Sequence, residues 1–98
     1  MKISDYHEKK ESPQTLTDIP GVGKSIANDL RNIGIYRVDD LKGLDAECIY
    51  ELSNASAGKV QDRCLLYVFR CAVYFAETPE HKRDPEKLKW WNWKEKRA

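Results

Sequence analysis

The stretch IPGVGK, residues 19–24, decides the fold that we expect for this chain. Two glycines flank Val22, and a proline precedes them. Because glycine adopts positive φ without a Cβ penalty and lets a ligand or another backbone approach closely, Gly21 and Gly23 suit a tight hairpin. Val22 can point into a core. If a helix begins near Lys24, its first amide groups lack intrahelical partners and carry partial positive charge, which favours a phosphate group.

The residues before this hairpin predict a short helix. Ser12 is suited to the N-cap and Pro13 to the first helical position, so we expect a helix over residues 13–18. Leu16 and Ile19 are the apolar residues with which this segment would contact the core.

The residues after the hairpin predict an amphipathic helix. Ile26, Leu30 and Ile33 recur at positions i, i+4 and i+7 and form one apolar stripe. Gly34 follows at the position where helices often end in the left-handed conformation, and Ile35 supplies the hydrophobic residue that accompanies a Schellman-type stop. We therefore expect this helix to end at Gly34.

Residues 38–53 look like a second, degenerate copy of the same arrangement, with a short helical turn, a connection and a helix. Asp45 is a good N-cap for that helix, and Ile49 and Leu52 would form its inner stripe. Asp45 stands at the place that Gly23 takes in the first copy, where a carboxylate would repel phosphate. We therefore expect a structural role for the second hairpin.

The most apolar part of the chain, VQDRCLLYVFRCAVYFAE, follows a break rich in small residues at 54–58. We expect a helix over residues 59–77 that is apolar nearly all round and therefore buried, with the hairpin units packed against it. An alternative is that the apolar excess serves a homodimer interface.

Two arginines, Arg63 and Arg70, share a face of this expected helix because they are seven residues apart. A buried arginine needs partners, so either this face reaches solvent or a carboxylate such as Asp62 or Glu47 pairs with it. Phosphate contact by these arginines is the less favoured alternative.

A Trp-rich C-terminal helix is expected over residues 85–93, since Asp84 and Pro85 fit the N-cap and first helical position. The tryptophans stand among lysines, and residues 79–98 carry seven basic and four acidic side chains. We expect Trp90 and Trp93 to close the open side of the core. Stacking on unpaired bases is the alternative, and a membrane interface is a distant third.

The stretch LTDIPGVGKSIANDLRNIGI, residues 16–35, resembles a helix-hairpin-helix motif, in which two short helices present a glycine-rich hairpin to the DNA backbone without reading base sequence. The resemblance implies an all-α, compact domain of tandem helix-hairpin-helix type (SAM-like) over residues 12–98, with hairpin units at 13–34 and 38–53. In some members hairpin carbonyls also hold a monovalent cation. The implied phosphate-binding residues are Gly21, Val22, Gly23, Lys24, Ser25 and Asn28.

Over a longer range, the stretches IPGVGKSIANDL, DRCLLYVFRCAVYFAE and KLKWWNWK resemble the small bacterial proteins of the pathogenicity-locus family, some of which carry a mitomycin-resistance label. The chain is also similar to the carboxy-terminal domain of the competence regulator TfoX. These resemblances imply a bacterial, cytoplasmic protein and define no biochemical activity.

The chemistry-bearing side chains do not predict an enzyme. The three cysteines, Cys48, Cys64 and Cys71, form no disulfide or metal pattern, and we expect them to be small buried residues in a reducing compartment. His7 and His81 stand in charged surroundings without ligand spacing, so we expect both to be solvated. No catalytic residue and no further cofactor is predicted.

The charge and length of the chain limit its function. With 98 residues it can form one small domain, for which we expect residues 1–11 to be a flexible N-terminal segment. The net charge of +1 excludes a strongly basic nucleic-acid coat, so DNA affinity should be weak and local. No membrane segment is predicted. We therefore expect a non-sequence-specific DNA-backbone-binding module or, alternatively, a protein-interaction module on the same scaffold, for which a homodimer is one form.

Overall fold

The computed structural model describes residues 15–94, and this part of the chain is all-helical, as predicted. The expected N-terminal segment 1–11 and the helix start at Ser12 lie outside the described residues. The α-helices are α2 (Lys24–Asn32), α3 (Ala46–Ala57) and α4 (Cys64–Glu77). Short 3-10 turns complete the described part: η1 (Leu16–Asp18), η2 (Val38–Leu41), η3 (Glu80–Lys82), η4 (Pro85–Leu88) and η5 (Trp90–Trp93).

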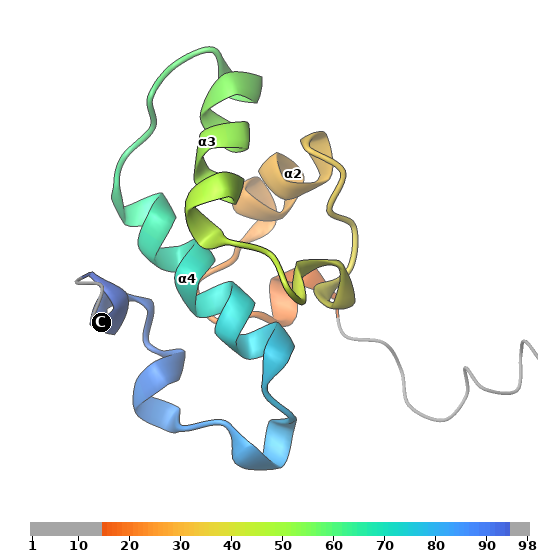
Figure 1. The fold of residues 1–98 in the computed structure, drawn as a ribbon, viewed down its shortest axis with the longest axis vertical. Helices are drawn as coiled ribbons and strands as arrows, with labels where there is room; N and C mark the ends of the chain where they lie inside the picture. The colour runs from red at the N-terminus through yellow and green to blue at the C-terminus, as the bar shows by residue number, and fades with distance from the viewer. Residues whose placement is uncertain (1–14, 95–98) are drawn as a thin grey trace, which may run out of the picture.

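Helix α4 is the centre of the fold, as its apolar sequence predicts. It contacts α3 and η2, and the C-terminal segment with η4 and η5 runs back along it (Figure 1). Phe69 and Cys71 are fully buried, together with most other apolar residues of the helix. The apolar surface of α4 is thus largely used inside the chain.

The predicted start of this helix at residue 59 is wrong, because residues 59–63 form part of the wide connection between α3 and α4 (Figure 1). Val60 is 81% exposed. The Asp62 carboxylate accepts a hydrogen bond from the N–H of Cys64, the first residue of α4, at 2.9 Å and so satisfies one donor at the observed helix start. Further back, the Gln61 N–H donates to the Asn54 side chain at 2.9 Å, which holds the connection on the end of α3.

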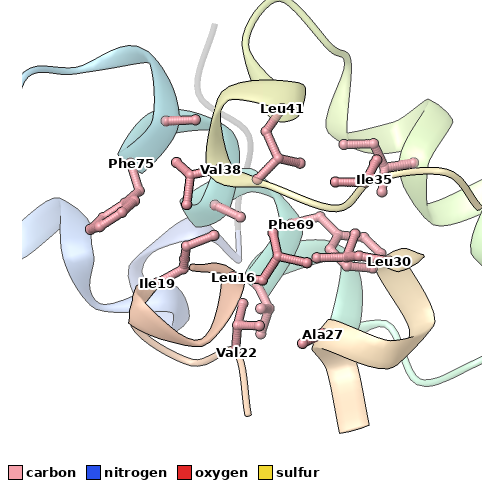
Figure 2. Close-up of a cluster of buried hydrophobic side chains, with 14 of the residues drawn as sticks. Leu16, Ile19, Val22, Ala27, Leu30, Ile35, Val38, Leu41, Phe69 and Phe75 are labelled. Carbon is pink, nitrogen blue, oxygen red and sulfur yellow. The ribbon is translucent and has the colours of Figure 1, made fainter. Parts of the chain in front are cut away.

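The core joins the first hairpin to α4. Leu16, Ile19 and Val22 turn inward from η1 and the hairpin, as predicted, and meet Phe69 and Phe75 of α4 (Figure 2). Helix α2 and the segment around η2 close the same cluster with Ala27, Leu30, Ile35, Val38 and Leu41. The position of the hairpin is therefore fixed by burial of its own apolar residues.

The predicted Schellman stop of α2 is confirmed. Gly34 has φ of 94°, and its N–H donates to the Arg31 carbonyl at 3.0 Å. The Ile35 N–H reaches back to the Leu30 carbonyl at 2.9 Å, and the Ile35 side chain is buried. These two bonds satisfy carbonyl groups that the helix end would otherwise leave unpaired.

Helix α3 begins at the predicted residue, but its buried face differs from the predicted one. Asp45 caps the helix, and Ile49 is buried, but Leu52 is 55% exposed. The buried face is centred between Ile49 and Tyr50 and continues to Ser53, so Leu52 turns away from it. The expected break at residues 54–58 is also displaced, since the helix continues through Ala57 and ends at Gly58.

The expected C-terminal helix is wrong in type, although Asp84 and Pro85 do begin a helical turn. Residues 85–93 form the two separate 3-10 turns η4 and η5, because side chains take the carbonyls that an α-helix would use. The Glu86 carbonyl accepts from the Asn92 side chain at 2.7 Å. The Lys87 carbonyl accepts from the Trp93 Nε1–H at 2.8 Å.

Candidate functional site

The first hairpin, residues 19–24, is a tight turn with two different glycines. Gly21 has φ of 87°, a conformation that strongly favours glycine. Gly23 is extended, with φ of −93° and ψ of −169°, and forms the N-cap of α2. A Cβ built on Gly23 would meet no heavy atom within 4 Å. The backbone of Gly23 therefore does not require glycine, and its bare Cα leaves space in front of the helix.

The N-terminus of α2 is open. The N–H groups of Gly23, Lys24 and Ser25 have no hydrogen-bond acceptor among residues 15–94, and the N-cap glycine carries no side chain to supply one. Lys24 is exposed beside them. Unpaired amides at a helix N-terminus carry partial positive charge, so this end of α2 is suited to an anion such as phosphate.

The predicted site residues do not all contribute in the same way. The exposed ones gather at the hairpin and the first turn of α2: Gly21, Gly23, Lys24, Ser25 and Asn28. Val22 is different, because its side chain is buried and its N–H donates to the Ile19 carbonyl at 3.0 Å. Val22 thus anchors the hairpin and has no free amide for a ligand.

Two carbonyls of the first hairpin accept backbone hydrogen bonds. The Ile19 carbonyl already accepts from Val22, and the Gly23 carbonyl accepts from Ala27 at 2.9 Å. Each of these oxygens keeps a second lone pair, so the hydrogen bonds do not decide whether a monovalent cation binds, and cation binding stays a prediction.

In the second hairpin, residues 42–45, and at the helix start behind it, two amide donors are satisfied by carboxylates. The Asp45 carboxylate accepts from the Glu47 N–H at 3.1 Å and caps α3. Glu77, at the end of α4, accepts from the Gly43 N–H at 2.7 Å. Negative groups of the chain itself thus take these two donors, and the structural role of this hairpin stays a prediction.

Trp90 from the C-terminal segment lies directly on the first hairpin, which the sequence analysis missed. A Cβ built on Gly21 would lie 2.8 Å from Cδ1 of Trp90, so the indole packs on the bare Cα of that glycine. Gly21 and Trp90 come from opposite ends of the described chain, and no local sequence signal connects them. Trp90 also packs against the core, as expected.

Arg70 of α4 forms hydrogen bonds that link the C-terminal segment to α3. Its side chain is 10% exposed, and its guanidinium donates to Glu47 Oε2 at 3.1 Å. It also donates to the carbonyls of Trp93 and Lys94 at 2.8 and 3.4 Å. The expected pairing with Glu47 is therefore confirmed for Arg70, whereas Arg63 is exposed.

The thiols provide no reactive or metal-binding cluster. Cys71 is buried, as expected, and burial raises the pKa of its thiol to about 11. The expectation that all three cysteines are buried is wrong, because Cys48 and Cys64 are exposed at the first turns of α3 and α4. Within the described part of the chain, no group of His, Cys, Asp and Glu side chains could hold a metal ion.

The described chain is a small all-helical domain with a glycine hairpin packed on a central helix. No helix among residues 15–94 is long and apolar enough to cross a bilayer. The family described as Pathogenicity locus (Cdd1) matches residues 9–98, and the chain belongs to this family. The "Mitomycin resistance protein McrB" of Streptomyces lavendulae is 36% identical over 78 residues, which cover 69% of this chain and 74% of that protein. No solved structure matches the chain.

Proposed function

We propose that this chain is a non-sequence-specific DNA-binding module of helix-hairpin-helix type, without a catalytic step. The first hairpin and the N-terminus of α2 would hold a backbone phosphate. The amides of Gly21, Gly23, Lys24 and Ser25 would donate to it, and the Lys24 side chain would add a full positive charge.

The contrast between the two hairpins carries this proposal. In the second hairpin, Asp45 and Glu77 accept hydrogen bonds from the amides of the turn and the helix start. In the first hairpin, the amides at the equivalent positions, those of Gly21 and Ser25, have no acceptor among the described residues. Exposed donors can bond to water, but a phosphate satisfies several of them together and gains from the helix dipole.

The expected affinity is low. A single competent hairpin supplies few phosphate contacts, and Asp29 on α2 adds a negative charge within the same helix. We therefore expect dissociation constants within the non-specific range, roughly 10⁻⁴ to 10⁻⁶ M, which rise with salt concentration. The name of the McrB relative states resistance to mitomycin and gives no biochemical activity that would alter this estimate.

The test is a titration of labelled duplex DNA followed by fluorescence anisotropy at several salt concentrations. Lys24→Glu should weaken binding at low salt, and the slope of log affinity against log salt should fall by about one because one phosphate contact is lost. Lys82→Glu is the matched control, since it makes the same charge change at an exposed lysine in η3.

Equal losses in the two variants would mean that only net charge matters, and absence of binding at low salt would exclude the DNA function. The second outcome would favour the alternative, a protein-interaction module. Leu52 of α3 and Val60 in the following connection are large, exposed apolar residues that could contact a partner or a second copy. Light scattering would then show whether the chain dimerises.

A further inference from the structure

Trp91 is the one tryptophan whose position packing does not explain. Trp93 donates its Nε1–H to the Lys87 carbonyl and lies 5.7 Å, centroid to centroid, from the ring of Tyr74. Trp90 packs on the core and on Gly21. Trp91 remains 52% exposed, and a large exposed aromatic side chain costs solubility unless it has a partner.

Trp91 is also close to the first hairpin. Its ring forms a T-shaped pair with that of Trp90, with ring centroids 5.7 Å apart and an interplanar angle of 84°. Since the indole of Trp90 lies on Gly21, a single aromatic ring separates Trp91 from the hairpin. An exposed aromatic side chain and the open amides of the hairpin thus belong to one region of the surface.

The charges around Trp91 are mostly positive. The described part of the C-terminal segment from residue 85 onward carries Lys87, Lys89 and Lys94 against one acid, Glu86. Glu86 is paired with Lys89 at 3.1 Å. Aromatic rings flanked by lysines are the arrangement with which proteins hold single strands, because bases stack on the rings while cations follow the backbone.

We propose that the hairpin and Trp91 form one site for a DNA strand with an unpaired base. The amides at the start of α2 hold a phosphate, and Trp91 stacks on a base of the same strand. This inference rests on the proposed function and narrows its substrate from DNA in general to single-stranded or locally unpaired DNA. A continuous duplex keeps its bases stacked on one another, so it presents no free base face to Trp91.

The experiment compares oligothymidine with a duplex of the same length, using labelled DNA and fluorescence anisotropy at low salt. Trp91→Ala should weaken binding of the single strand about ten-fold, within the range measured for loss of one base–aromatic stack, and should leave duplex binding within two-fold. Trp91→Phe keeps a ring and should recover part of the affinity. Tyr36→Ala, which removes an exposed aromatic between α2 and η2, should change neither affinity.

A second readout is tryptophan emission. Stacking should quench the emission of the wild-type protein on oligothymidine, and Trp91→Phe should lose most of this quench. Thermal melting of each variant confirms that it is folded.

The outcomes separate this inference from the proposed function. In one outcome, Lys24→Glu weakens binding of both DNAs, while Trp91→Ala either weakens binding of neither or weakens binding of both equally. The stacking site is then excluded and the backbone site stands. If Trp91→Ala weakens single-strand binding and Lys24→Glu does not, Trp91 acts apart from the hairpin and the shared site is excluded. If Lys24→Glu affects neither DNA, the proposed function and the shared site both fail.

Discussion

At the scale of single residues, the two hairpin glycines have different reasons to be glycine. Gly21 has positive φ and its Cα is covered by the Trp90 indole, so both its backbone and its surroundings exclude a side chain. Gly23 has an extended backbone and open space in front of it. We infer that the fold requires a glycine at Gly21, whereas the glycine at Gly23 keeps the amides at the start of α2 exposed.

Gly21→Ala should therefore destabilise the protein more than Gly43→Ala does. Both glycines have positive φ, which costs an alanine about 1–2 kcal/mol, but a Cβ at Gly43 meets no atom within 4 Å. At Gly21 the Cβ must displace Trp90, which adds an overpacking cost of about 1 kcal/mol or more. Urea unfolding measures the difference. Equal free energies of unfolding for the two variants would show that Trp90 does not hold the hairpin.

At the scale of elements, the starts of α2 and α3 differ in a single feature. Asp45 caps α3 with its carboxylate, whereas Gly23 at the N-cap of α2 has no side chain. Asp and Asn are among the best N-cap residues and are better than Gly by a few tenths of a kcal/mol. The uncapped start of α2 therefore gives up some stability and keeps its donors exposed.

Gly23→Asp should separate stability from DNA binding. The extended backbone and open space at Gly23 accept the side chain, so the free energy of unfolding should stay equal or rise by a few tenths of a kcal/mol. DNA affinity should fall because the carboxylate occupies the amides and repels phosphate. Thermal melting and the anisotropy titration measure the two effects.

Gly23→Asn is the matched variant for charge. It caps the helix equally well without the negative charge, so its loss of DNA affinity should be smaller than that of Gly23→Asp. Unchanged affinity in both variants would exclude the start of α2 as the phosphate site.

The ends of elements could be predicted from sequence where the signal is local. Asp45 and Asp84 as caps and Gly34 as a stop were correct, because each acts on backbone groups within a few residues. The start of α4 and the outward turn of Leu52 were missed. They depend on side-chain bonds in the connection after α3 and on which face of α3 meets α4, and apolar periodicity alone does not specify these contacts.

At the scale of the whole molecule, contacts between distant parts of the chain add to the local difference between the two hairpins. Glu77 of α4 satisfies Gly43 of the second hairpin, and Trp90 covers Gly21 of the first. The residue types of the candidate site could be predicted from the stretch IPGVGK, but the residues that surround the site could not. Tertiary packing brings these residues together, and no spacing in a single sequence encodes it.

Arg70 is where the C-terminal segment is held to the rest of the fold. Its guanidinium joins Glu47 of α3 to the carbonyls of Trp93 and Lys94, and the side chain is largely buried. Hydrogen bonds to a charged group contribute about 1.5–3 kcal/mol, and removal of one buried partner leaves the others unsatisfied. The two 3-10 turns η4 and η5 are too short to be stable alone, so their position depends on such contacts.

Arg70→Ala should accordingly lower the free energy of unfolding by about 2–4 kcal/mol and shift tryptophan emission to longer wavelength, because Trp90 and Trp93 lose part of their packing. Glu47→Gln should cost less, since the arginine keeps an amide oxygen and both carbonyls as acceptors. Arg63→Ala, which truncates an exposed arginine beside the same helix, should stay within about 0.5 kcal/mol of wild type. Urea unfolding followed by emission gives both quantities. If Arg70→Ala loses stability without a change in native-state emission, Arg70 stabilises the packing of α3 on α4, and apolar contacts alone hold the C-terminal segment.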